Sequence, residues 1–186
     1  FSGTIPDSYL FGGCLGITDL ETLDTHVEEN LFDRQIVTSL AYSNGILYGG
    51  TSNAGGTGAS HPEGEERVSC VIFAYDVENK KLLATLDMRD YYPQLPETLN
   101  YIDGIQADPN VDENGRIWGM VGEAMFNFTF DKETNTFKVN KFLEYGYTQP
   151  TNISRHWDAI PFAFDGNGNV YACFHTNGGL RRINME

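Results

Sequence analysis

The sequence predicts an all-β protein, and three observations support this fold class. Short segments rich in β-branched and aromatic residues, the types enriched in strands, recur along the 186 residues. The chain contains 20 glycines, and many of them stand between those segments, where tight turns need them. A D/N-x-E triplet recurs at spacings of 57, 55 and 53 residues, a period typical of one structural unit used repeatedly. The triplets begin at Asp19, Asp76, Asp131 and Asn184.

The clearest unit covers residues 37–87. A turn at Asn44-Gly45, a long polar connection over residues 52–67 and a turn at the Asp76 triplet divide it into four segments. Four antiparallel strands of this length form one blade of a β-propeller. The strands are expected at residues 37–42, 46–51, 68–75 and 81–86.

Three further units follow the same order, two of them incompletely. Residues 101–144 predict four strands, at 102–107, 117–121, 124–130 and 137–143. Residues 158–186 predict three, at 159–164, 170–175 and 180–183, without a fourth. Residues 1–36 begin at a second strand, because Phe1-Ser2-Gly3-Thr4 matches Tyr48-Gly49-Gly50-Thr51. We therefore expect a single propeller portion of about three and a half blades, either truncated or completed by another chain.

A repeated motif carries a family resemblance. It reads Gly45-Ile46-Leu47-Tyr48, Gly115-Arg116-Ile117-Trp118 and Gly168-Asn169-Val170-Tyr171, and a strand ending in Asp and a turn follow. In these features the chain resembles the propeller repeats of bacterial kelch-like, PQQ-like and SMP-30-like proteins. The resemblance implies an exported bacterial protein, extracellular or on the cell surface, with a cytoplasmic location as the alternative. It leaves the activity open, since propellers serve as binding scaffolds, lyases, hydrolases and oxidoreductases.

Charge and hydropathy argue against two classes of partner. The formal net charge is -14, which would repel the phosphate backbone of a nucleic acid. No apolar run approaches the roughly 18 residues of a spanning helix, and no basic amphipathic stretch suits a membrane surface. The cysteines Cys14, Cys70 and Cys173 cannot all pair with one another, and we expect them to be buried small side chains.

The long connections predict where a ligand would bind. In a blade, the connection from the second to the third strand and the connection to the next blade emerge at the same rim, and these are the long ones here. Long loops on a rigid scaffold commonly carry binding or catalysis. The candidate ligand-binding residues in or beside them are Asn53, His61, Tyr91, Tyr92, Asp103, Arg155, His156, Trp157, Asp158 and His175.

Two carboxylates in this set recur with the repeat. Asp103 and Asp158 are 55 residues apart, near the start of the first strand of their units, where the preceding unit has Thr38. Because innermost strands line the central channel, both carboxylates are expected at its mouth, to bind a cation or sugar hydroxyls. The alternative is that each caps a backbone turn or braces the neighbouring blade.

Motifs for metals and phosphates are weaker. His61, His156 and His175 share the rim and could hold a divalent cation such as calcium or manganese, although they lack a local ligand spacing. Residues 165–169 resemble the start of a calcium loop, but a hairpin turn explains them. The glycine-rich run over 49–58 lacks the lysine of a phosphate loop, and the triplets are expected to be structural turns.

The leading functional prediction is a module that binds a ligand or partner, with a carbohydrate as the first ligand class and another small molecule as the second. One alternative is a metal-assisted polysaccharide lyase or a lactonase-like hydrolase, in which the cation acidifies the substrate or activates water. Another is a structural or protein-interaction module of a larger chain. Open blade edges also allow a homo-oligomer.

Overall fold

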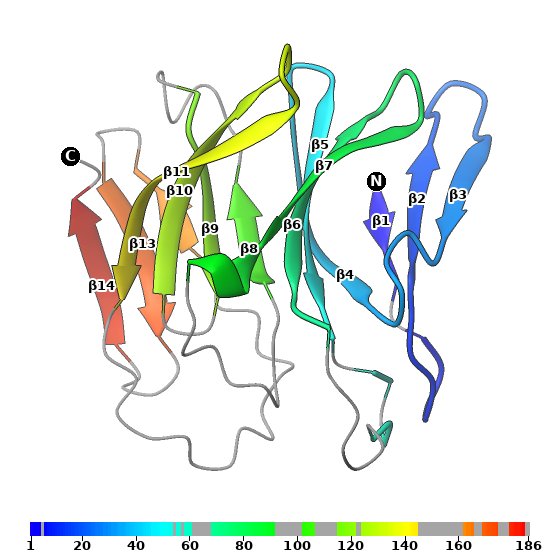
Figure 1. Cartoon of the computed structure of the whole chain (residues 1–186), viewed down its shortest axis with the longest axis horizontal. Coiled ribbons are helices and arrows are strands. Elements are labelled where there is room, and N and C mark those ends of the chain that lie inside the picture. The colour runs from blue at the N-terminus through cyan, green and yellow to red at the C-terminus, as the bar shows by residue number, and fades with distance from the viewer. Residues whose placement is uncertain are drawn as a thin grey trace.

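The computed structural model describes residues 1–4, 6–53, 55–56, 58–60, 68–91, 102–106, 115–121, 124–144, 162–165, 169–174 and 179–184. Their strands form four antiparallel sheets that stand side by side in a row (Figure 1). The all-β fold class is therefore confirmed. Within these ranges, no helix is long and apolar enough to cross a membrane.

Strands that follow one another in the chain are neighbours within each sheet. The first sheet contains β1 (Ser2–Gly3), β2 (Cys14–Thr18) and β3 (Thr25–Glu29). The second contains β4 (Ile36–Ser43), β5 (Ile46–Ser52), β6 (Val71–Asp76) and β7 (Lys81–Asp87), followed by the short 3-10 helix η1 (Met88–Asp90). The third contains β8 (Ile102–Gln106), β9 (Ile117–Val121), β10 (Ala124–Asp131) and β11 (Thr136–Glu144). The fourth contains β12 (Phe162–Phe164), β13 (Asn169–Phe174) and β14 (Gly179–Asn184).

The observed strands coincide with the predicted ones, with a few differences. β6 begins at Val71 rather than at residue 68. β12 is described from Phe162, and residues 159–161, where its prediction begins, lie outside the described residues. The sequence did not predict the bounds of β3, because its polar residues hide the strand pattern. The first and fourth sheets have three strands each, as the incomplete units predicted. No closed ring is seen among the described strands.

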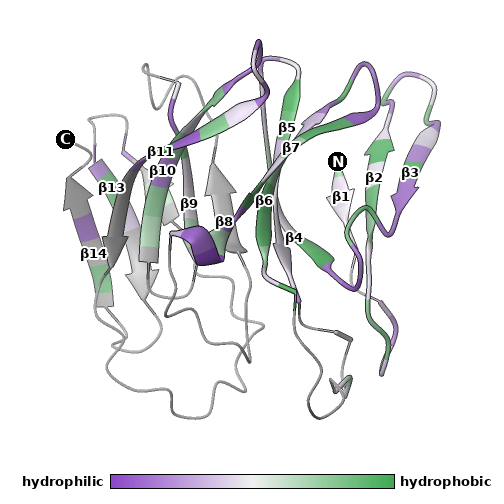
Figure 2. Cartoon of the chain, viewed as in Figure 1, coloured by the Kyte–Doolittle hydropathy of each residue, from purple (hydrophilic) through white to green (hydrophobic). Residues whose placement is uncertain are grey.

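β5 and most of β6 are buried on both faces. Hydrophobic residues make up much of these two strands (Figure 2). Tyr48 and Ile72 belong to a core that includes Phe126 and Phe128 of the third sheet. On the opposite face, Leu47, Phe73 and Tyr75 pack in a second core with Leu15 and Val37. Alternate residues of a strand point to opposite faces, so the same two strands supply both cores. Adjacent sheets are thus held together by face-to-face packing.

A glycine opposite a phenylalanine recurs inside the second and third sheets. Gly49 of β5 pairs with Phe73 of β6, and a side chain at Gly49 would start 2.0 Å from the Phe73 ring. The corresponding pair of the third sheet is Gly119 and Phe126. In the second sheet, the ring therefore occupies the space that a side chain on the neighbouring strand would fill.

The connections at the two ends of the strands differ. The hairpin turns β2–β3, β6–β7 and β10–β11 lie at the upper end in Figure 1. At the other end lie the connections from the second to the third strand of a sheet and those from one sheet to the next, as far as they are described. We call these the turn end and the rim.

Candidate functional site

The turn end is built from the repeated acidic triplets. The Asp19 carboxylate accepts hydrogen bonds from the backbone N–H groups of Glu21 (2.8 Å) and Thr22 (3.0 Å). Asp131 accepts in the same way from Glu133 (2.8 Å) and Thr134 (3.2 Å). These backbone donors hold the pKa of both carboxyl groups below its usual value. The structural role predicted for the triplets is confirmed at these turns.

The rim joins connections from two different sheets. The backbone N–H of Gly56, in the connection after β5, donates to the carbonyl of Leu10, in the connection after β1 (2.8 Å). The Arg34 guanidinium, which precedes β4, lies 5.1 Å from the centre of the Phe11 ring. The prediction that such connections gather on one side therefore holds for their described parts.

Tyr9 and Leu10 project from this surface. Their side chains are 75% and 57% exposed. The Leu10 N–H donates to the Asp7 carbonyl (3.2 Å), which closes a turn around Tyr9. Tyr9 has a φ of 66°, in the left-handed region that costs a bulky residue about 1 kcal/mol. A large aromatic side chain is thus kept in solvent by a strained, hydrogen-bonded turn.

The two rim residues of the candidate set that are described, Asn53 and Tyr91, differ in position. Asn53 is 1% exposed, and its side-chain amide donates to the Val68 carbonyl (2.9 Å), which ties together the two ends of the long connection. Tyr91 is 41% exposed and follows η1, which is anchored by the buried Met88. Tyr91 therefore remains available to contact a ligand, whereas the hydrogen bond of Asn53 to Val68 favours a structural role for Asn53.

Asp103 and Thr38 occupy the same position in two sheets. In β4, Val37 pairs with Thr51 and Ser39 with Gly50, so that Thr38 is the extra residue of a bulge. In β8, Ile102 pairs with Val121 and Gly104 with Met120, so that Asp103 is the extra residue. β4 and β8 contact each other, and Thr38 is exposed. The predicted equivalence of these two residues is confirmed, and Asp103 lies inside its strand.

The remaining candidates lie outside the described residues. They are His61, Tyr92, Arg155, His156, Trp157, Asp158 and His175. Their assignment stays a prediction, and so does the cation site that the histidines would form.

A hairpin accounts for the residues that resemble a calcium loop. The Asp165 carboxylate accepts from the backbone N–H (3.2 Å) and the side-chain amide (2.8 Å) of Asn169. The Tyr171 hydroxyl donates to the same carboxylate (3.4 Å). These bonds close the turn between β12 and β13, as the hairpin interpretation predicted. In the part of the chain that the structure describes, no group of three His, Cys, Asp or Glu residues could hold a metal ion.

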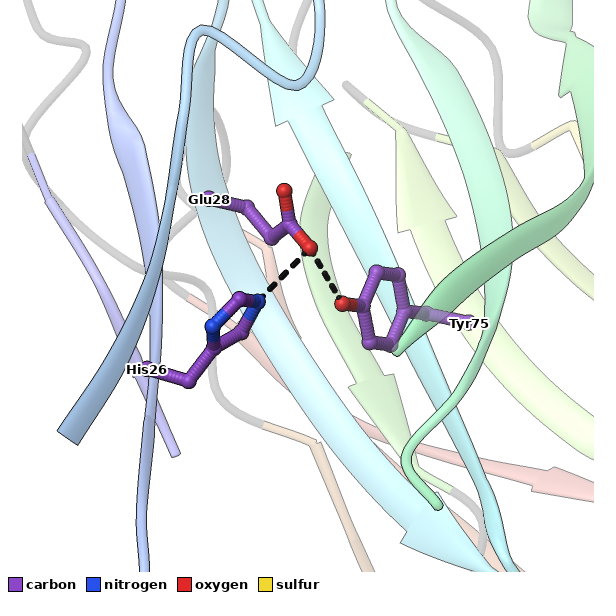
Figure 3. A network of polar contacts seen from close by, with 3 residues as sticks. All are labelled: His26, Glu28 and Tyr75. Atoms are coloured by element: carbon purple, nitrogen blue, oxygen red, sulfur yellow. Dashed lines mark hydrogen bonds and ion pairs between the residues drawn. The ribbon is translucent and has the colours of Figure 1, made fainter. Parts of the chain in front are cut away.

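A polar network connects the first and second sheets (Figure 3). The buried Tyr75 donates its hydroxyl to Oε1 of Glu28 at 2.6 Å, and Nε2 of His26 lies 2.8 Å from the same oxygen. The bonds from Tyr75 and His26 lower the pKa of Glu28. Burial, followed by the bond to Glu28, raises the pKa of Tyr75, so its phenol stays protonated. The network is therefore suited to holding two sheets together.

A buried hydroxyl also organises the rim end of β5. Oγ1 of Thr51 accepts from the backbone N–H of Val71 (2.8 Å) and donates toward Gln35. Thr51 is fully buried. Its side chain thus continues the pairing of β5 with β6 beyond the last backbone pair, Gly50 and Ile72.

Sequence reasoning missed Tyr9, Leu10, His26 and Glu28. The run Tyr9-Leu10-Phe11, between the polar pair Asp7-Ser8 and the pair Gly12-Gly13, was a signal that could have marked an exposed apolar loop. The His26 and Glu28 pair carried no comparable signal, because its partner Tyr75 is distant in the chain. No model of a known protein family matches the chain, and no curated protein sequence matches it.

Proposed function

We propose that this chain is a portion of a β-propeller that binds a carbohydrate at its rim. The four sheets represent its blades, and β4 and β8 are innermost strands that line a central channel. The row of antiparallel sheets, each with its strands in chain order, supports this architecture. The resemblance to bacterial propeller repeats agrees with it.

The observation that carries the proposal is the shared bulge of β4 and β8. Bulges turn a side chain away from the regular alternation and are frequent beside functional sites. Thr38 and Asp103 are the extra residues of equivalent bulges in β4 and β8, two strands that contact each other. A hydroxyl and a carboxylate at the mouth of a channel are groups that can hydrogen-bond sugar hydroxyls.

Surface composition at the rim is consistent with a sugar ligand. Tyr9 and Tyr91 are exposed there. Aromatic rings offer an apolar face with a polar edge, which matches the alternating C–H and O–H groups of a sugar ring.

Isothermal titration calorimetry of the whole chain tests the proposal. The probes are cellohexaose, mannohexaose, xylohexaose and maltohexaose, with polygalacturonate and alginate as acidic counterparts. We expect at least one probe to bind, and Asp103→Asn to weaken its affinity about tenfold, the loss expected for a hydrogen bond to a charged group. Asp131→Asn, at the turn end, is the matched control and should leave the affinity unchanged. Absence of heat with every probe would refute carbohydrate binding.

A further inference from the structure

Tyr9 is held in a conformation that keeps its ring at the surface. The side chain is 75% exposed and the residue has a positive φ, so packing of the ring into a core does not offset the cost of this backbone conformation. The turn is closed by the Leu10 to Asp7 hydrogen bond and anchored by the Ser8 N–H, which donates to the Asp7 carboxylate (2.7 Å).

The glycine-rich connection after β5 supports this turn from the neighbouring sheet. Gly58, at a φ of 79°, lies against Cδ1, Cε1 and Cζ of the Tyr9 ring, and a Cβ there would approach Cε1 to 2.6 Å. Gly56 donates to Leu10 (2.8 Å), and Ala59 donates to Gly56 (2.9 Å). Gly58 therefore makes room for one side of the ring, while most of the Tyr9 side chain remains exposed. Two connections distant in sequence build one platform.

We propose that the Tyr9 ring is a stacking platform for a neutral pyranose unit. This inference rests on the proposed carbohydrate binding and adds its location and the class of sugar. The exposed Asp7 carboxylate lies two residues away, where it can accept hydrogen bonds from sugar hydroxyls. The same carboxylate, with the net charge of -14, repels uronates and sulfated sugars. A neutral sugar fits both the ring and the charge around it.

The test is calorimetry with the six carbohydrate probes named above and with variants of the platform. Tyr9→Ala should weaken binding of the best neutral probe at least about tenfold, the scale of a residue that dominates an interface. Tyr9→Phe should stay within about threefold, because the ring is retained. Gly58→Ala should weaken binding as well, because its Cβ displaces the ring. Tyr42→Ala, which removes an exposed tyrosine outside the platform, is the control and should bind as the unchanged chain does.

Other results would overturn the inference in distinguishable ways. If a neutral probe binds and Tyr9→Ala leaves its affinity unchanged, carbohydrate binding stands and the platform is wrong. If the acidic polymers bind more tightly than every neutral probe, the assigned sugar class is wrong. If no probe binds, the proposed function fails together with the platform. If sedimentation shows that Tyr9→Ala abolishes self-association instead, the surface is an interface between copies of the chain.

Discussion

The triplet turns at the turn end and the contacts between connections at the rim use hydrogen bonds of different range. At the turn end, Asp19 and Asp131 bond to backbone groups two and three residues further on. At the rim, Gly56 bonds to Leu10 and Thr51 bonds to Val71 and Gln35. Hydrogen bonds within a turn form the same turn wherever the same residues occur. Bonds between distant residues depend on both connections, so the surface that they form differs from one pair of sheets to the next. Substitutions at the rim can therefore alter this surface without changing the scaffold.

The largest effect should follow from breaking a distant bond at the rim. Thr51→Val keeps the shape of the buried side chain but leaves the Val71 N–H without its acceptor, so we expect a loss of about 2 kcal/mol in the free energy of unfolding. Urea denaturation at pH 7 measures it. Thr22→Val, which removes an exposed hydroxyl that accepts from Asp24 at the turn end, is the control and should cost less than about 0.5 kcal/mol. Equal losses in the two variants would contradict the distinction between the ends.

A smaller effect is expected where a distant bond is partly open to water. Tyr75→Phe removes the donor to Glu28, and we expect a loss of about 1 kcal/mol at pH 7, because water can replace part of the bond to the half-exposed carboxylate. The pKa of Glu28 is lowered in the folded state, so its stabilisation exists above the unfolded pKa and disappears as pH falls through the folded pKa. The difference between the variant and the unchanged protein should therefore shrink below about pH 4.

Denaturation of both proteins at pH 7 and pH 3 checks this pH dependence. Tyr42→Phe, at an exposed tyrosine, provides the control and should show no difference at either pH. A difference for Tyr75→Phe that is as large at pH 3 as at pH 7 would mean that the ionised Glu28 contributes nothing.

The smallest effect, a gain, tests whether the local turns are interchangeable. The fifth residue of the first three triplet turns has a positive φ, at Leu23 (63°), Lys80 (51°) and Asn135 (54°). Asn tolerates this conformation better than Leu, and Leu23 is 73% exposed, so Leu23→Asn should stabilise the protein by about 0.5 kcal/mol. Thermal unfolding measures the gain. Leu20→Asn in the same turn should change little, and an equal gain there would point to reduced surface hydropathy instead.

The predictability of the fold follows the same division between local and distant determinants. Glycine turns and apolar alternation located the strands of the second and third sheets, because those signals lie within a few residues of the elements they specify. The bounds of β3 were not predicted because Glu28 bonds to a tyrosine of another sheet, and His26 bonds to Glu28, so that neither residue adds to an apolar pattern. A polar pair that is satisfied only in the folded state leaves no hydrophobic period in the sequence.

The candidate site was harder to predict than the fold. The repeat placed Asp103 and Thr38 at equivalent positions, and their bulges confirm that equivalence. The amide side chain of Asn53 is suited to binding a ligand, yet it is buried and donates a hydrogen bond to the Val68 carbonyl. Tyr9 was overlooked because its ring lies beside Gly58, which is distant in the sequence and near it only in the folded chain. Residue type indicates which chemistry is possible, and tertiary contacts decide which side chains are presented.

The pairing of Gly49 with Phe73, and of Gly119 with Phe126, bears on how such a chain grows. Each pair lies within a single sheet. In the second sheet, where the Phe73 ring fills the space beside Gly49, both residues of the fit are therefore encoded in one unit of sequence. A duplicated unit therefore carries both halves of this fit and needs no compensating substitution in its neighbour. Gene duplication could thus lengthen the row sheet by sheet, while selection acted separately on the connections of each new copy.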